Sequence, residues 1–283
     1  MNHTHRVSPF ILLLPAAMTT AGVFLLPVAW LANMSFITIK SGGILSSKYT
    51  LDSYVQLFSD PFTVTITAHS IFLALTVTFL SLVLSYPIAL ALFRSESRWT
   101  GALTVLLVSP LLVSSVVRTY GWIVILGERG WVNFVVQTLG MSSSPLKLMN
   151  NFAGVVVALT EILMPYMALS LISGFGRIEV RYEEAAITLG ASPWSTFWRV
   201  TFPLSLPGVA VGSLICFALA ISSFVTPQLL GGGRVFLLST EIYDGALVTL
   251  NWPRAAALSM LLLTLLITAV LVFNRYMKHL EEQ

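Results

Sequence analysis

Six long apolar stretches, divided by polar segments, dominate the hydrophobic pattern of this chain. Each comes close to, or exceeds, the roughly 20 residues that an α-helix needs to cross a bilayer. The first stretch is longer than the apolar core of a secretory signal, so we expect it to remain as a membrane helix. The pattern predicts an all-α integral membrane protein, one domain over residues 1–283, with six transmembrane helices at about 10–34, 66–93, 101–126, 152–175, 208–227 and 255–273.

The composition supports a membrane protein and excludes several functions. Of the 283 residues, 56% are hydrophobic and only 10% are charged, whereas soluble domains carry about 25% charged residues. The net charge of +3 comes without a basic run, so we expect no nucleic-acid partner. No ATPase-type phosphate-binding loop occurs in the sequence. We therefore expect no catalytic site, no cofactor and no metal site in this chain, and we take His3 and His5 as solvated side chains.

Three longer polar segments follow the first, third and fifth stretches, and each shows signs of local structure. In the first, residues 41–43 predict a turn, and a short helix is expected to start from a cap at Thr50 or Asp52. The second and third segments are expected to hold short helices over 132–139 and 238–248. Such helices are compatible with a surface that receives a soluble partner and equally with ordinary covering loops.

A polar loop over residues 177–203, between the fourth and fifth stretches, begins with a helical pattern. Its apolar side chains recur with the 3.6-residue period of a helix, at Ile178, Tyr182, Ala185, Ala186 and Leu189. Its charged side chains fall on two other faces, Glu179 with Glu183, and Arg177 with Arg181 and Glu184. Their spacing allows local ion pairs. A loop this ordered indicates a docking surface.

A sharp turn is expected in the middle of the 177–203 loop. Gly190 stands where the left-handed stop of the first helix would fall. Ser192 can cap a second short helix, and Pro193 suits its first position. That helix is expected to end near Pro203 and to carry Trp194, Phe197, Trp198 and Val200.

The same loop resembles a motif of the permease subunits of binding-protein-dependent ABC importers, EAA-x3-G-x9-I-x-LP. The matching residues are Glu184, Ala185, Ala186, Gly190 and Pro203, with Val200 in place of the usual Ile and Phe202 in place of the usual Leu. The segments VRTYGW (117–122) and FVTPQLLGGG (224–233) look like the first permease of the spermidine/putrescine-type subfamily. The resemblance extends over nearly the whole chain.

This resemblance implies a fold, partners and a location. It implies the type I ABC importer permease fold, with cytoplasmic coupling helices, in the bacterial inner membrane. The implied partners are two cytoplasmic ATPase subunits that bind ATP and Mg, a second related permease, an extracytoplasmic substrate-binding protein and the lipid bilayer. The resemblance identifies residues 177–203 as a loop that couples the permease to the ATPase. It implies that Glu184 makes a polar contact with the ATPase, that Ala185 and Ala186 let the ATPase approach closely and that Gly190 forms a turn. Arg181 and Pro203 are also expected to be ATPase-coupling residues.

The distribution of Lys and Arg predicts the same orientation. With six helices, one side holds both termini and eight basic residues: Arg6, Arg94, Arg98, Arg177, Arg181, Arg199, Arg275 and Lys278. The other side holds six: Lys40, Lys48, Arg129, Lys147, Arg234 and Arg254. The positive-inside bias is small, but it places both termini and the 177–203 loop in the cytoplasm.

Two ionisable residues fall inside predicted spans, and each is costly in hydrocarbon unless it faces protein or water. From the helical rise, Arg118 and Glu161 lie at similar depths, roughly 12 and 14 Å from the outer ends of their helices. A salt bridge between them is one interpretation. In the other, both line a translocation pathway with Tyr120, Trp122 and Tyr166, where aromatic rings could contact a cation.

The function predicted from these features is half of the translocation pathway of an ATP-driven importer for a small solute. The resemblance suggests a polyamine, although the outer segments hold five acids against six bases and so form no acidic funnel. An ion-coupled secondary transporter is the alternative. It would use Arg118 and Glu161, but it leaves the ordered 177–203 loop unexplained. A membrane enzyme would need convergent reactive groups at one face, which the sequence does not supply.

Overall fold

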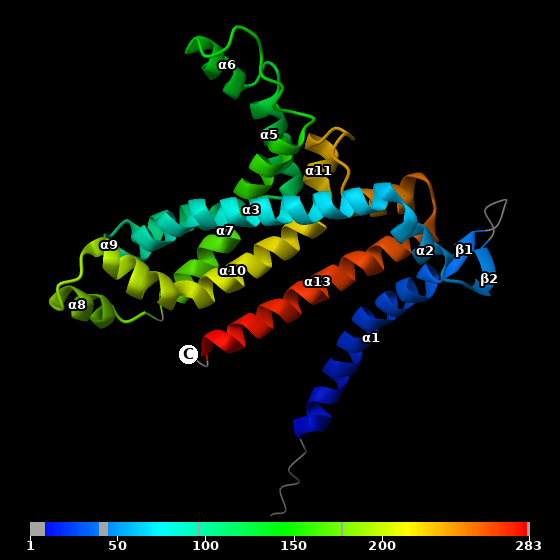
Figure 1. Cartoon of the computed structure of the whole chain (residues 1–283), viewed down its shortest axis with the longest axis horizontal. Helices are drawn as coiled ribbons and strands as arrows, with labels where there is room; N and C mark the ends of the chain where they lie inside the picture. Colours follow the sequence, from blue (N-terminus) through cyan, green and yellow to red (C-terminus); the bar gives the residue numbers. More distant parts are fainter. Residues whose placement is uncertain (1–8, 40–44, 96, 177, 282–283) are drawn as a thin grey trace, which may run out of the picture. The chain divides into compact units, whose positions relative to one another are not determined.

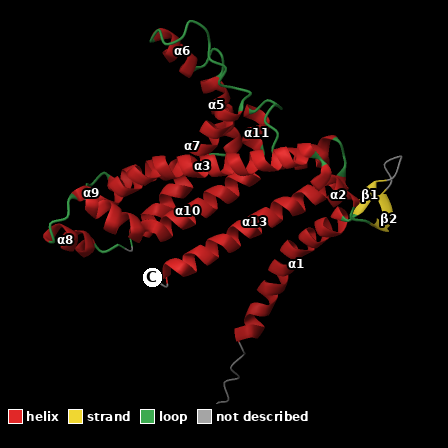
Figure 2. Cartoon of the chain, viewed as in Figure 1, coloured by secondary structure: helices red, strands yellow, loops and turns green. Residues whose placement is uncertain are grey.

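The computed structural model describes residues 9–39, 45–95, 97–176 and 178–281. The chain divides into two compact units, which are described separately: residues 1–61 with 241–263, and residues 62–240 with 264–283. The expected turn at 41–43 and the side chain of Arg177 lie outside the described residues. Helices account for most of the described chain (Figure 2).

The first unit contains the first apolar helix and a small hairpin. Helix α1 (Pro9–Ser35) leads into strands β1 (Ile37–Ile39) and β2 (Leu45–Tyr49), which pair antiparallel. Helix α2 (Asp52–Ser59) follows. The hairpin was not predicted, and the cap of α2 is Leu51 without a side-chain hydrogen bond, so the prediction of a cap at Thr50 or Asp52 was wrong.

Polar contacts hold this first unit together around the ends of its helices. The hydroxyls of Ser35 and Tyr54 lie 2.7 Å apart. Arg254 lies in α13 (Trp252–Glu281), and its Nη2 forms ion pairs with Asp60 at 3.6 Å and Glu241 at 3.5 Å. The outer helix expected over 238–248 is α12 (Leu238–Tyr243) continued by a π-helical turn, η3 (Asp244–Val248).

The second unit is built around α7 (Phe152–Phe175), whose bounds match the predicted fourth span. The Asn151 side chain caps its start by accepting a hydrogen bond from the Gly154 amide at 2.8 Å. Helix α3 (Pro61–Arg94) lies along α7, where the Ser85 hydroxyl donates to the Met164 carbonyl at 3.0 Å (Figure 1). Most of α7 is buried, so it forms the core of this unit.

Helices α7 and α10 (Phe202–Ser222) cross closely at two glycines, Gly174 and Gly208. A Cβ atom built on Gly174 would lie 2.7 Å from the Gly208 Cα, and one built on Gly208 would lie 2.9 Å from the Gly174 Cα. Small residues allow helix backbones to approach closely in membrane proteins. The two backbones therefore touch at a point where no side chain fits.

The predicted third span is not one continuous helix. Helix α4 (Thr100–Val108) passes into the 3-10 turn η1 (Ser109–Leu112), and α5 (Ser115–Leu126) then starts in a new direction, at a bend of 97°. The extended backbone of Val113 and the cap at Ser114, which accepts from the Val116 amide, produce the break. Short α6 (Trp131–Thr138) follows α5, as predicted for 132–139.

The predicted fifth span also differs from the structure. One helical segment suitable for a membrane runs over Pro193–Ser222, and α11 (Val225–Leu230) forms a separate short helix where the span was expected to end at 227. In all, five helices among the described residues are long and apolar enough to cross a membrane, and the bent α4–α6 region would supply the sixth.

Candidate functional site

The 177–203 loop begins with α8 (Val180–Thr188) and turns as the sequence predicted. Gly190 has a φ of +86°, a left-handed conformation that suits glycine. The Gly190 amide donates to the Ile187 carbonyl at 2.9 Å and the Ala191 amide to the Ala186 carbonyl at 3.0 Å. These two bonds form the Schellman arrangement that closes a helix, so the chain reverses at a well-defined elbow.

The second half of the loop starts as predicted and continues further than predicted. The Ser192 hydroxyl accepts from the Ser195 amide, and Pro193 begins α9 (Pro193–Thr196). The helix does not end near Pro203; it widens into the π-helical turn η2 (Phe197–Thr201) and runs on as α10. A proline inside an α-helix clashes with the carbonyl four residues back. Here the Phe202 amide reaches back five residues to the Phe197 carbonyl, and this wider winding precedes Pro203.

The apolar stripe predicted for the first helix of the loop does not pack as one face. Ile178 is buried, whereas Tyr182, Ala185 and Leu189 are exposed, Leu189 to 89%. These exposed side chains lie on a helix that projects beyond the ends of α3 and α10 (Figure 1). The exposed half of the stripe is therefore a free apolar surface.

The charged side chains of α8 point in different directions. Glu184 is exposed, and Arg181 forms an exposed ion pair with Glu179, with 3.9 Å between Nε and Oε2. Glu183 is turned inward: its Oε1 accepts from Arg94 Nη2 at 2.7 Å and from the Thr201 hydroxyl at 2.6 Å. Burial alone would raise the pKa of Glu183, but these hydrogen bonds and the positive charge of Arg94 outweigh it and lower that pKa.

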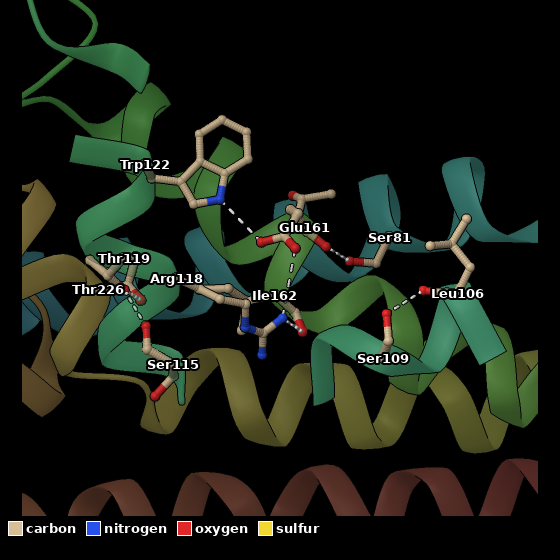
Figure 3. Close-up of polar contacts among 11 residues, drawn as sticks. Ser81, Leu106, Ser109, Ser115, Arg118, Thr119, Trp122, Glu161, Ile162 and Thr226 are labelled. Atoms are coloured by element: carbon tan, nitrogen blue, oxygen red, sulfur yellow. Dashed lines mark hydrogen bonds and ion pairs between the residues drawn. The ribbon is translucent and has the colours of Figure 1, made fainter. Parts of the chain in front are cut away.

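A second cluster of polar groups surrounds Arg118, in the first turn of α5, and Glu161, near the middle of α7 (Figure 3). Arg118 Nη1 lies 3.7 Å from Glu161 Oε1, and it donates to the Ile162 carbonyl at 3.4 Å. The indole Nε1 of Trp122 donates to Glu161 Oε2 at 3.1 Å. The structure thus brings together three of the five residues predicted for the pathway.

The two charges of this cluster differ in their access to the surroundings. The Arg118 side chain is 11% exposed and the Glu161 side chain 38%. Arg118 Nε is buried without a hydrogen-bond partner among the described residues. Tyr120, exposed on α5, and Tyr166, on α7, take no part in the hydrogen bonds and ion pair that link Arg118, Glu161 and Trp122.

The break before α5 gives Arg118 its position. Because the chain turns at residues 113–114, Arg118 lies one turn into a new helix, and its amide donates to the Ser114 carbonyl at 3.1 Å. The neighbouring Thr119 hydroxyl lies 2.9 Å from that of Thr226, which ties α5 to α11. Thr119 and Thr226 were not predicted as site residues, because only the fold places them together.

Comparison with known proteins gives matches over nearly the whole chain. Residues 7–282 match the family described as "Binding-protein-dependent transport system inner membrane component". The spermidine/putrescine transport system permease protein PotB of Haemophilus influenzae is 30% identical over 259 residues, which cover 92% of this chain and 90% of the relative. PotB of Escherichia coli is 31% identical over 258 residues, covering 91% and 94%. The molybdenum transport system permease protein ModB of Mycobacterium tuberculosis is 34% identical over 195 residues, covering 69% and 72%.

Solved structures share the fold at lower sequence identity. A chain of a bacterial ABC transporter involved in the import of alginate superposes with a TM-score of 0.78 at 18% identity, covering 95% of this chain and 94% of that one. A chain of the inward-facing MetNI methionine ABC transporter gives a TM-score of 0.57 at 17% identity, covering 77% and 95%. The family match over residues 7–282, together with relatives 30–31% identical over about nine-tenths of both chains, establishes that this chain belongs to the family of inner membrane components of binding-protein-dependent transport systems and is a permease subunit of an ABC importer.

Proposed function

We propose that this permease subunit forms half of the import pathway for a polyamine-type organic cation. The observation that carries this proposal is the 30–31% identity to spermidine/putrescine permeases over about nine-tenths of both chains. The molybdenum permease matches a smaller share of this chain, 69%. Polyamines are cations and molybdate is an anion, so the two candidate solutes make opposite demands on the pathway.

The electrostatics of the Arg118–Glu161 cluster favour the cation. The Glu161 side chain is the more exposed member of the ion pair, at 38%, whereas the Arg118 side chain is nearly buried, at 11%. A carboxylate at the edge of a partly dehydrated site attracts an ammonium group and repels an oxyanion. Glu161 is therefore our candidate for solute contact, with the ring of Trp122, which donates to it, as a neighbouring surface for a cation. Tyr120 and Tyr166 stay candidate pathway residues outside this cluster.

The solute is tested by the ATP hydrolysis of the complete transporter. The purified complex, with its ATPase subunits, second permease and binding protein, is reconstituted in liposomes and given spermidine, putrescine or molybdate. We expect a polyamine to stimulate ATP hydrolysis severalfold and molybdate to have no effect. Stimulation by molybdate alone would overturn the polyamine assignment and favour an oxyanion importer.

For coupling, we propose that α8 docks on a cytoplasmic ATPase subunit, which binds ATP and Mg, and that both termini of this chain lie in the cytoplasm. An exposed Glu184 next to the exposed Ala185 on a projecting helix supports the docking role. The Gly190 elbow gives that helix a defined angle. In this arrangement ATP hydrolysis belongs to the partner, and this chain transmits movement.

Charge reversal at Glu184 is expected to weaken the binding of the ATPase. Glu184→Lys places a cation where the proposed contact needs an anion. We expect at least about a thirtyfold loss of affinity, since truncating one partner of a charge pair that the interface buries costs about 2 kcal/mol or more. The measurement is co-purification of the ATPase subunits with the tagged permease. Glu128→Lys, the same charge change at an exposed position between α5 and α6, is the control and should bind normally. Equal binding by both variants would remove Glu184 from the interface.

A further inference from the structure

Two adjacent glutamates in α8 have opposite surroundings. Glu184 is exposed, while the side chain of Glu183 retains 20% exposure and contacts the body of the second unit. One residue along a helix turns the side-chain direction by about 100°. The two carboxylates therefore serve different surfaces, and only Glu184 is available to a partner.

The Glu183 carboxylate joins three elements through a single oxygen. Arg94 is the last residue of α3, Thr201 is the last residue of the π-helical turn η2, and both donate to Oε1 of Glu183. Thr201 is buried, with 1% exposure. Hydrogen bonds to an ionised group are about twice as strong as neutral ones, so this contact is a firm polar link between α8 and the ends of two long helices.

The elements on the far side of this link are packed against one another. The Tyr86 hydroxyl of α3 lies 2.9 Å from the Ser205 hydroxyl of α10. The Tyr86 ring also packs edge-on against Phe197 of η2, with ring centroids 5.8 Å apart, and against Phe175 of α7, at 5.3 Å. Through these contacts of Tyr86, α3 packs directly against α7, η2 and α10 on the membrane side of Arg94 and Thr201.

On the basis of the docking role proposed for α8, we infer that Glu183 is the positioning residue through which α8 pulls on the membrane helices. Glu184 faces the ATPase, and Glu183 faces Arg94 and Thr201. A movement of the ATPase that displaces α8 is therefore transmitted through Glu183 to the ends of α3 and α10. The π-helical winding of η2 places Thr201 beside Glu183 and leads without interruption into α10. Glu183 acts through Arg94 and Thr201 and contacts neither nucleotide nor solute.

The test separates coupling from docking. Glu183→Gln keeps the size of the side chain and removes its charge, and Glu184→Gln is the matched control on the next residue. In the reconstituted complex we expect Glu183→Gln to retain its ATPase subunits within about twofold. Solute imported per ATP hydrolysed should fall about tenfold, because a neutral amide oxygen accepts weaker hydrogen bonds from Arg94 and Thr201 than a carboxylate does. Glu184→Gln should instead weaken ATPase binding.

A reciprocal exchange tests whether the contact itself matters. Arg94→Glu alone should lower solute imported per ATP as Glu183→Gln does, and Arg94→Glu combined with Glu183→Arg should restore part of it. An unchanged ratio of solute to ATP in Glu183→Gln, or equal loss of yield, ATP hydrolysis and import, would overturn the inference and leave Glu183 a folding contact. If the wild-type chain itself binds no ATPase, the proposed docking fails instead, which is a different result.

Discussion

Leucine in place of Gly208 is expected to prevent α7 and α10 from packing, and so to abolish the folded protein. The Cβ of any residue at this position would lie 2.9 Å from the Gly174 Cα and 3.1 Å from the Ser170 carbonyl oxygen. Both neighbours are backbone atoms of the buried core helix, so they cannot turn aside as a side chain would. Overpacking of this kind costs about 1–3 kcal/mol where a core can adjust, and more where it cannot.

The measurement for Gly208→Leu is the yield of monodisperse protein in detergent and its thermal unfolding temperature. Gly121→Leu provides a matched control, because Gly121 also lies within an apolar helix but has nothing within 4 Å of its Cβ position. We expect the control to match the wild type in yield. A Gly208→Leu protein that unfolds at the wild-type temperature would show that the crossing of α7 and α10 has room to open.

The positions of most membrane helices could be predicted because they depend on local composition. The predicted span 152–175 coincides with α7, and the elbow at Gly190, Ser192 and Pro193 follows from backbone preferences of those residues. The break before α5 could not be predicted, because the apolar run continues across Val113 and Ser114. Hydropathy shows which residues can lie in a membrane but not where the helix axis changes direction. The continuation of α9 into α10 does not follow from the sequence, because a proline such as Pro203 is typical of a helix end, and only the π-helical turn η2 lets the helix run on.

The side-chain contacts of the site depended on the fold to different degrees. An ion pair of Arg118 with Glu161 could be weighed in advance, because two rare charges at similar depth in neighbouring helices have few other partners. Glu183 could not be distinguished from Glu184 in this way. Its partner Arg94 lies 89 residues earlier in the chain, and only the packing of α3 against α10 brings Arg94 and Thr201 to the same oxygen.

Removal of Glu161 is expected to destabilise the protein far more than removal of Arg118. Glu161→Ala leaves a guanidinium that is 11% exposed without its counter-charge. Removing one partner costs most where the remaining charge is buried, and we expect a loss of about 3 kcal/mol, the lower end of the range for fully buried pairs. Arg118→Ala leaves a carboxylate that is 38% exposed and still accepts a hydrogen bond from Trp122. We expect the second variant to lose only about 1 kcal/mol, as for partly exposed pairs. Thermal unfolding of both purified variants checks this order.

The double variant Arg118→Met with Glu161→Leu separates stability from solute contact. Replacing both charges of a buried pair by apolar side chains of similar size is often close to neutral, so we expect the double variant to fold nearly as well as the wild type. If Glu161 contacts a polyamine, the double variant should still require a much higher polyamine concentration than the wild type for half-maximal import. The reason is that the ammonium group loses the acidic side chain that this cluster offers it. Import by the double variant at the wild-type solute concentration would show that Arg118 and Glu161 only hold α5 against α7.

Trp122→Phe, which removes one hydrogen bond to Glu161 and neither charge, should shift the required concentration less than the double variant does.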